Sequence, residues 1–342
     1  MGAHPLARRG CDEQLPAGGR LPRTRRKIMA TRRISRARAA LLFALCWACL
    51  PGGAAGQRAR QGLLSLETAR IFYEVVGAGE PIIVVHGGPG LDHNYLQPGL
   101  DALATRNTLV HYDQRGTGRS VANLDSVAIN LDAFVGDIDA LRQALGYERV
   151  SVLGHSWGAL LALEYAARHP ETTRALILMN PVEPGARFRD QVEERQRRAR
   201  TQEDSTERAT LTATEGFAAR DPNIVSQVYR IAFRQTLRDR TRISEIELDL
   251  AESTAKNGSE VARLLGASIG EVDWWERLPN IQAPALVIHG RFDVSPVAIA
   301  QALGASLGQG RVVVLDTGHF PYVEGRDALV SAISTFFVDL SR

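Results

Sequence analysis

The sequence predicts an α/β fold in which a mostly parallel sheet, covered by helices on both faces, carries a helical insertion. Two observations support this prediction. From Leu64 onward, short β-rich runs alternate with helical stretches, an order typical of parallel sheets. From about Val182 to Glu276 the strand-like runs stop, and the chain is rich in Arg, Glu, Gln and Thr. This second stretch predicts helices with polar faces, inserted between two strands of the sheet.

The predicted strands are short runs of β-branched and other apolar residues. Ile82–Val85 is apolar throughout, as a strand buried on both faces of its sheet requires. The other runs are Ile71–Val76, Thr108–Tyr112, Val150–Leu153, Ala175–Met179, Ala285–Ile288 and Val312–Leu315. The helical stretches between and after them are 131–145, Ala159–Ala167, Ala298–Leu307 and Ala328–Leu340.

These patterns divide the chain into three parts. Residues 1–56 form a leader, residues 57–181 and 277–342 form the α/β core, and residues 182–276 form a helical cap. Pro184-Gly185 and 279–284 contain the turn-forming residues expected near the two ends of the cap.

The leader has the order of a secretory signal. Four arginines between positions 32 and 38 precede the apolar run Ala39–Leu50, and the small residues Gly52–Gly56 follow. Cleavage is expected after Ala55 or Gly56, and the position of Met29 just before this unit suggests that it is the true start. The apolar run is too short for a stable membrane anchor. We therefore expect a periplasmic or secreted protein.

Charge and cysteine content narrow the function further. The leader holds eleven of the 41 Lys and Arg residues and two of the 38 acids, which leaves 30 basic and 36 acidic residues after it. A mildly acidic mature chain argues against nucleic acid as a partner. All three cysteines lie in the leader, so the mature chain has no disulfide, thiolate metal site or cysteine nucleophile. We expect no cofactor and no metal, and a small molecule or short peptide as substrate.

Residues 154–158, Gly-His-Ser-Trp-Gly, fit the pattern G-x-S-x-G between a predicted strand and a predicted helix. In that context the pattern marks a nucleophilic serine. A serine that presents its hydroxyl above a sheet needs a very tight turn, and the two glycines remove Cβ atoms that would collide there. The amino terminus of the following helix favours developing negative charge. The pattern therefore predicts Ser156 as a nucleophile.

A serine nucleophile needs a base, and the base needs an acid to orient it. With the chain order serine, acid, histidine, both partners are expected on loops after later strands. His319 is the one histidine that is both late in the chain and on such a loop. Asp293 follows the strand Ala285–Ile288 and is the preferred acid, and Asp316 remains the rival.

The third requirement is an oxyanion hole made of backbone N–H groups. The N–H of Trp157, directly after the serine, is one expected donor. The loop His86–Gly90 after strand Ile82–Val85 is expected to supply the other, from Gly88 or, as second choice, Gly87. Glycine allows the backbone to approach a substrate closely.

Three segments together resemble the signatures of a known family. His86–Gly90, Asp113–Ser120 and Gly154–Gly158 are similar to those of the proline iminopeptidase family of α/β-hydrolases. The likeness covers 64–181 and 284–342 well and the cap poorly. It implies an α/β-hydrolase fold, and it implies that Asp113–Ser120 is a structural loop that supports the oxyanion segment.

In the aminopeptidases of this family, acids of the cap hold the free α-amino group of the substrate, beside an apolar pocket. The resemblance does not identify which acids of this cap match. The candidates are Glu193, Glu194, Glu215, Asp221, Glu245 and Glu247. Trp274 and Trp275 are expected to wall such a pocket or to pack into the junction between cap and core.

The sequence thus predicts an exported serine hydrolase that uses Ser156, His319 and Asp293 and forms an acyl-enzyme. By the resemblance, it is an aminopeptidase that releases an N-terminal residue. A carboxylesterase acting on small apolar esters is the alternative, because the same core serves both. A non-catalytic binding protein of this fold is the third hypothesis.

Overall fold

The computed structural model describes residues 59–270 and 272–342, which belong to one compact unit. The predicted leader, with its signal sequence, Met29 and the three cysteines, lies outside the described residues. Within the described part, no helix is long and apolar enough to cross a membrane.

In the described residues, nine strands form one sheet with the order β1-β2-β4-β3-β6-β7-β8-β9, and β5 pairs with β2. The pairs that involve β2 are antiparallel, and all pairs from β4–β3 to β8–β9 are parallel. The strands are β1 Arg60–Ser65, β2 Ala69–Gly77, β3 Glu80–Val85, β4 Asn107–Tyr112, β5 Val121–Ala122, β6 Val150–His155, β7 Thr173–Met179, β8 Ala285–Gly290 and β9 Gly310–Leu315. Because parallel strands end at one edge, the loops after β3, β6, β7, β8 and β9 come together there.

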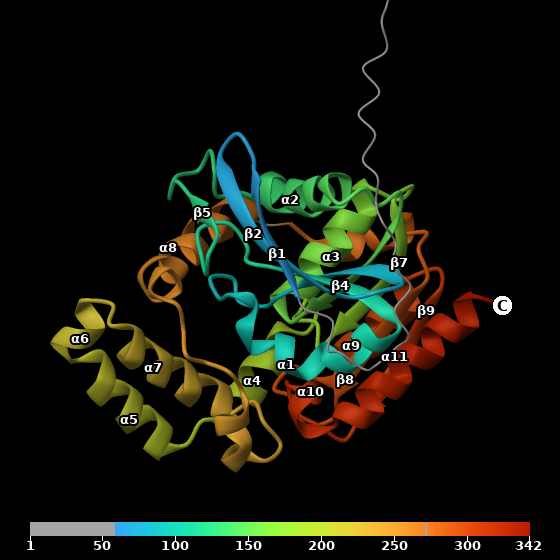
Figure 1. The fold of residues 1–342 in the computed structure, drawn as a ribbon. Coiled ribbons are helices and arrows are strands. Elements are labelled where there is room, and N and C mark those ends of the chain that lie inside the picture. The colour runs from blue at the N-terminus through green and yellow to red at the C-terminus, as the bar shows by residue number, and fades with distance from the viewer. Residues whose placement is uncertain (1–58, 271) are drawn as a thin grey trace, which may run out of the picture. The chain divides into compact units, whose positions relative to one another are not determined.

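Alternating side chains of the parallel strands enter two separate layers of core. In β3, Ile83 and Val85 pack with the helices on one face, whereas Ile82 and Val84 pack on the other. The first layer is covered by α2 Leu131–Ala144, α3 Trp157–Arg168 and α9 Val297–Ser306. The second is covered by α11 Arg326–Leu340 and the segment 97–105. Figure 1 shows the twisted sheet between these layers.

The predicted strands and helices of the core are all present, most of them longer by one to a few residues. Two strands were not predicted. β1 is an edge strand whose residues are exposed or only half-buried, so it lacks the apolar run that identifies a buried strand. β5 has only two residues, too few to form a pattern.

The chain between β7 and β8 forms helices and, in its described residues, no strand. These helices are α4 Arg189–Ala199, α5 Gln202–Thr212, α6 Glu215–Ala218, α7 Pro222–Arg234 and α8 Glu252–Ile269. In Figure 1, α5, α6 and α7 lie together at the lower left, and α8 lies nearer to β5. The buried carboxylate of Asp204 joins α5 to α7 and the segment after it, because Arg234 and Arg240 both donate to it at 2.5–2.6 Å.

The remaining helical segments are short. They are η1 His93–Tyr95, α1 Gln97–Leu100, η2 Asp101–Thr105, η3 Arg240–Glu245, η4 Trp274–Glu276, η5 Leu278–Asn280 and α10 Pro321–Glu324.

Candidate active site

Ser156 lies at the turn between β6 and α3 with φ 57° and ψ −121°. A positive φ is strained for a residue with a Cβ, and such strain is typical of functional turns. The flanking glycines permit it. A Cβ on Gly154 would lie 2.2 Å from the carbonyl oxygen of Gly158, and a Cβ on Gly158 would lie 2.2 Å from that of Val85. The sequence therefore forms this turn only because positions 154 and 158 carry no side chain.

Asp293 and His319 lie side by side at the carboxyl edge of the sheet. The Nδ1 atom of His319 is 2.7 Å from Oδ2 of Asp293. Asp293 follows β8 and is fully buried, and His319 follows β9 and is 8% exposed. The ring of His319 lies 4.9 Å, between centroids, from that of His155, the residue before Ser156. Because Ser156, Asp293 and His319 follow the parallel strands β6, β8 and β9, all three lie at the same edge of the sheet.

The Asp293 carboxylate is stabilised in its charged form. Burial by itself would raise its pKa, but the charge and hydrogen bond of His319 outweigh burial, and the net pKa lies below the ordinary value. Asn180 Nδ2 donates to Oδ2 at 2.6 Å, and the backbone N–H of Ser295 donates to Oδ1 at 3.0 Å. An ionised, fixed carboxylate can orient an imidazole and stabilise its protonated form.

Sequence reasoning missed Asn180. This residue directly follows β7, the strand between those of Ser156 and Asp293, and it has φ 47°. Asparagine tolerates this conformation better than most residues with a side chain. An asparagine at the carboxyl end of the neighbouring strand was the one available signal.

Asp316, the rival acid, lies elsewhere. Its carboxylate is exposed and accepts a hydrogen bond from Arg291 Nε at 2.7 Å. In the described part of the chain, no hydrogen bond or ion pair joins its carboxylate to His319.

The loop after β3 differs from the prediction in one respect. Gly87 cannot donate its N–H to a substrate, because that N–H already donates to the hydroxyl of Tyr95 at 2.6 Å. Among the hydrogen bonds of the described residues, the N–H of Gly88 has no acceptor. Gly88 has φ 132°, a conformation that side chains disfavour. The N–H of Trp157, first residue of α3, has no acceptor within its helix. Gly88 and Trp157 remain the available donors.

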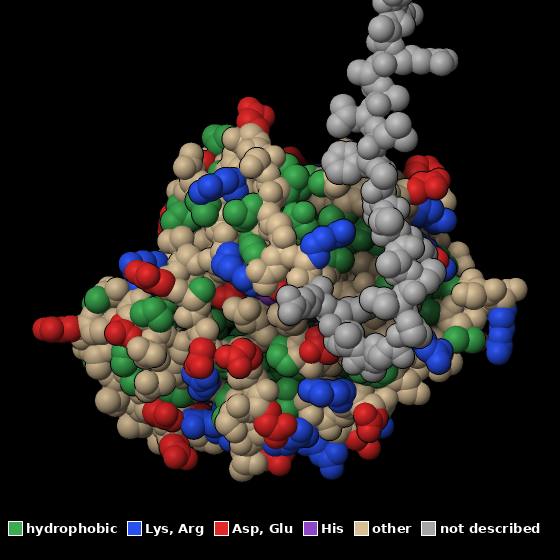
Figure 2. Space-filling model, viewed as in Figure 1, with side chains coloured by type: hydrophobic (Ala, Val, Ile, Leu, Met, Phe, Trp, Pro, Cys, Tyr) green, Lys and Arg blue, Asp and Glu red, His purple; other side chains and the backbone are tan. Residues whose placement is uncertain are grey.

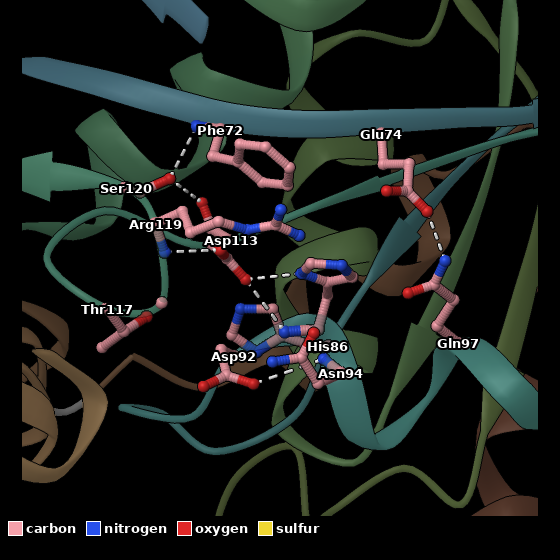
Figure 3. A network of polar contacts seen from close by, with 12 residues as sticks. Phe72, Glu74, His86, Asp92, Asn94, Gln97, Asp113, Thr117, Arg119 and Ser120 are labelled. Carbon is pink, nitrogen blue, oxygen red and sulfur yellow. Dashed lines mark hydrogen bonds and ion pairs between the residues drawn. The ribbon is translucent and has the colours of Figure 1, made fainter. Parts of the chain in front are cut away.

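The Asp113–Ser120 segment contacts this loop, and Figure 3 shows Asp113 pointing toward the part of the loop that carries Asp92 and Asn94. Asp113 Oδ1 accepts from the backbone N–H of His93 at 3.1 Å and lies 2.6 Å from Nδ1 of the same residue. Its other oxygen accepts from the N–H of Arg119 at 2.7 Å, and the Arg119 guanidinium lies 3.5 Å from the centre of the Phe72 ring. The backbone N–H of Gln114 is 3.0 Å from Nε2 of His86. These buried contacts fix the loop from 86 to 93.

Three cap elements contact the site. Arg195 of α4 donates through Nε and Nη2 to the carbonyl oxygen of Asp293, at 3.1 and 2.6 Å. After α7, the carbonyl oxygen of Thr236 accepts from the N–H of His319 at 2.9 Å. On α8, the backbone of Gly258 approaches Gly90 so closely that a Cβ on either glycine would lie within 2.3 Å of the other's carbonyl oxygen.

The six cap acids predicted as candidates do not converge on the site. Glu194 pairs with Arg197 and Arg198, and Glu245 pairs with Arg242. Asp221 caps the amino terminus of α7, and the other three are exposed, namely Glu193, Glu215 and Glu247. On the face drawn in Figure 2, acidic and basic side chains lie interspersed over the surface rather than in fields of one sign.

Trp274 and Trp275 are both buried where the cap rejoins the core. Trp274 packs edge-on against Trp157, with ring centroids 6.4 Å apart. Trp275 packs against Phe188, and its Nε1 donates to Glu183 at 3.0 Å. Both tryptophans therefore pack into the junction.

A cavity of about 270 Å³ lies between α5, α6, α7 and α8, and its lining is part apolar and part polar. The apolar lining residues are Phe217, Val225, Val228, Tyr229, Ala232 and Ala255, and the polar ones are Arg208, Arg220, Thr254 and Ser259. Aromatic contacts lead from its wall to the catalytic edge. Tyr229 packs on Phe233 at 5.8 Å, Phe233 on Phe320 at 5.2 Å, and Phe320 on His319 at 5.2 Å. Within the described residues, no group of three His, Cys, Asp or Glu side chains could hold a metal ion.

Comparisons with known proteins show which proteins this chain resembles. The sequence model of a family described as "alpha/beta hydrolase fold" matches residues 80–326. A proline iminopeptidase of Heyndrickxia coagulans is 26% identical over 287 residues, which cover 81% of this chain and 98% of that protein.

Two solved structures extend the comparison. The proline iminopeptidase of Mycobacterium smegmatis superposes with a TM-score of 0.64 at 25% identity, covering 82% of this chain and 98% of that one. An esterase of Exiguobacterium antarcticum superposes with a TM-score of 0.57 at 20% identity, covering 78% and 95%, and shows a shared fold.

Proposed function

The chain belongs to the α/β-hydrolase family and is a proline iminopeptidase-like hydrolase, and we propose that it is a serine hydrolase that forms an acyl-enzyme. The observation that carries this proposal is the 2.7 Å contact between Asp293 and His319, beside a serine held in a strained strand-to-helix turn. The arrangement has the base, the orienting acid and the half-buried serine nucleophile that acyl transfer requires.

In the proposed reaction, Ser156 Oγ attacks the substrate carbonyl carbon while Nε2 of His319 accepts the hydroxyl proton. Asp293 accepts a hydrogen bond from Nδ1–H and stabilises the imidazolium. The tetrahedral intermediate collapses when His319 returns the proton to the leaving amine or alcohol. A water molecule then gives a proton to His319 and attacks the carbonyl carbon of the acyl-enzyme ester. The second tetrahedral intermediate releases the carboxylic acid as His319 returns that proton to Ser156 Oγ, which regenerates the free enzyme.

Negative charge develops on the carbonyl oxygen in both halves of the reaction. The N–H groups of Gly88 and Trp157 are the proposed donors to that oxygen, because neither has a protein acceptor in the described part of the chain. Removal of one such donor in other serine hydrolases costs about 10²–10³ in kcat.

For the substrate, the first proposal is a peptide or amide with a free, proline-like amino-terminal residue. It is supported by relatives that carry the name proline iminopeptidase and align over nearly their whole length, at 23–26% identity.

A carboxylesterase for small apolar esters is the second candidate, and one observation favours it. The predicted amine-binding acids are exposed, paired with arginines or used as a helix cap. Among the described residues, the cap side chain that hydrogen-bonds to the triad is that of Arg195, a cation, which offers nothing to an ammonium group. The cap carbonyl oxygen of Thr236 already accepts from the N–H of His319. Apolar walls suffice for an ester.

The serine chemistry is tested by labelling and by mutation. We expect a fluorophosphonate to modify wild-type protein on Ser156, located by mass spectrometry, and Ser156→Ala to lose both labelling and turnover while keeping its thermal unfolding midpoint. A folded wild-type protein that does not label would support the non-catalytic alternative instead.

The substrate is tested by comparing proline-naphthylamide with short p-nitrophenyl esters on the same preparation. Aminopeptidase turnover supports the first proposal. Ester turnover without aminopeptidase activity would establish the second.

The proposal also includes export, on the evidence of the basic, apolar and small-residue order in residues 32–56. Expression of the full chain in a bacterial host should give a mature protein that begins at Gly56 or Gln57. An unprocessed amino terminus in the cytoplasmic fraction would contradict export.

A further inference from the structure

Two buried side chains outside the triad, Tyr95 and His155, connect the three catalytic loops. The backbone N–H of Gly87 donates to the hydroxyl of Tyr95 at 2.6 Å. That hydroxyl lies 2.9 Å from Nδ1 of His155, and Nε2 of His155 lies 2.9 Å from the carbonyl oxygen of His319. Tyr95 is 3% exposed and His155 is 1% exposed, so water does not compete for these bonds.

These contacts form a hydrogen-bonded chain from Gly87 to His319, and its two end groups determine which atom donates in each bond. A backbone N–H can only donate and a carbonyl oxygen can only accept. Nε2 of His155 must therefore carry the hydrogen that faces His319, which leaves Nδ1 as an acceptor in the neutral ring. The Tyr95 hydroxyl accepts from Gly87 and donates its own hydrogen to Nδ1. Every donor in the chain has one acceptor.

The protonation states of the two side chains agree with this direction. Burial, followed by the nearby charge of His319, lowers the pKa of His155 to about 3. Burial raises the pKa of the Tyr95 hydroxyl above its ordinary value. Both groups therefore stay neutral over the working range of pH, and the chain keeps the same direction.

This hydrogen-bonded chain joins three segments that belong to different strands. Gly87 follows β3, His155 ends β6 and precedes Ser156, and His319 follows β9. His319 is then held on each side of its backbone, because its N–H donates to Thr236 and its carbonyl oxygen accepts from His155. At the other end, the bond to Tyr95 holds the N–H of Gly87, so that the next N–H, that of Gly88, is the one left free.

We propose that Tyr95 and His155 are positioning residues, which hold His319 and the oxyanion loop in register with Ser156 through this hydrogen-bonded chain. The inference rests on the proposed serine chemistry and adds to it. Both side chains are buried. They act by keeping the base and the oxyanion donor in a geometry where small displacements reduce the rate strongly.

Tyr322 provides a matched control within the same cluster. It is fully buried, and its ring packs on those of Tyr95 and His155 at 6.4 and 6.1 Å. Its hydroxyl has no hydrogen-bond partner among the described residues. Removing either hydroxyl deletes one oxygen atom from the same aromatic core, but only Tyr95→Phe breaks the chain.

The test compares Tyr95→Phe and Tyr322→Phe with wild type, using the substrate that wild type turns over. We expect Tyr95→Phe to lower kcat about tenfold, the effect of roughly one lost buried hydrogen bond, with little change in KM. The rate of labelling of Ser156 by a fluorophosphonate should fall by a similar factor. Tyr322→Phe should keep kcat, KM and the labelling rate. Equal kinetics for the two variants would overturn the proposal.

Two substitutions of His155 separate the links. The amide of His155→Gln can reach the position of Nε2 and donate to His319, whereas that of His155→Asn reaches only the position of Nδ1 and accepts from Tyr95. We expect Gln to retain more kcat than Asn, because it keeps the link to the base. If Asn equals Gln at matched thermal stability, the link to His319 has no positioning role. These variants also decide the question if Tyr95→Phe does not fold.

The same experiments distinguish a failure of the proposed serine chemistry from a failure of the positioning role. If wild type neither labels nor turns over any substrate, the proposed function fails. If wild type labels and turns over substrate but Tyr95→Phe and His155→Asn match it, only the positioning role fails.

Discussion

Asn180 Nδ2 lies 2.6 Å from Oδ2 of Asp293, the same oxygen atom that faces Nδ1 of His319. One carboxylate oxygen thus has two donors, one from β7 and one from the loop after β9. The asparagine satisfies part of the carboxylate's need for hydrogen-bond donors without adding a charge. Burial raises the pKa of Asp293, and the hydrogen bond from Asn180 helps His319 and His289 to hold the net pKa below its ordinary value.

Asn180→Gly tests this donor without backbone strain, since glycine accepts the positive φ of 47°. We expect kcat to fall about tenfold, because a buried hydrogen bond to a charged group is lost. Asn180→Asp should be worse. A second carboxylate beside Asp293 raises the pKa of one of the two carboxyl groups. As pH falls, this variant should therefore lose activity at a higher pH than wild type does. An unchanged acid limb of kcat/KM against pH would contradict this.

Asp293→Asn should lower kcat by about 10³–10⁴, because the amide favours the wrong tautomer of His319. Asp316→Asn is the matched control, since Asp316 is exposed and pairs with Arg291. We expect it to keep at least half of wild-type kcat. The reverse order of the two effects would identify Asp316 as the acid.

Arg195→Met should lower kcat several-fold, because the two hydrogen bonds from α4 to the carbonyl oxygen of Asp293 are lost. Arg198→Met on the same helix is the control, because Arg198 is exposed and pairs with Glu194. We expect wild-type kinetics for it. Steady-state kinetics of both variants would show whether the cap acts on the acid loop.

Gly258→Ala and Gly266→Ala lie on the same helix, α8, and should have opposite effects on stability. A Cβ at 258 would lie 2.3 Å from the carbonyl oxygen of Gly90, whereas a Cβ at 266 meets nothing within 4 Å. We expect Gly266→Ala to stabilise by about 0.5–1 kcal/mol through helix propensity. Gly258→Ala should destabilise and also lower kcat, because α8 is pushed away from the oxyanion loop. Urea unfolding and kcat measure both effects.

Asp204→Asn should destabilise the cap by about 2 kcal/mol at pH 7, because Arg234 and Arg240 lose their shared carboxylate. Burial would raise the pKa of Asp204, but the arginines outweigh it and the net pKa is lowered. A carboxyl with a lowered folded pKa stabilises above its unfolded pKa, and this contribution is lost as pH falls toward the folded value. The difference from wild type should therefore shrink below about pH 4. Glu203→Gln, an exposed neighbour in the same turn, should show no such difference.

The predictable parts of the site were those encoded locally. Gly154 and Gly158 flank Ser156 in five consecutive residues, and the steric reason for each is a contact made at that turn. The buried strands were predictable because each contains a short run of mainly apolar residues, such as Ile82–Val85. β1 was not, because an edge strand with half-exposed residues carries no such pattern.

The sequence by itself determined the fold class and the position and order of the three candidate triad residues, because periodicity and short motifs are properties of neighbouring residues. Only the tertiary structure distinguished Asp293 from Asp316, found Asn180, excluded the N–H of Gly87 as an oxyanion donor and joined Tyr95 to His155. Asn180 and Asp293 are 113 residues apart, and His155 and His319 are 164 apart. Such pairs meet because the strand order places the ends of β6, β7, β8 and β9 at one edge, and no local pattern records which side chains then come within hydrogen-bonding distance.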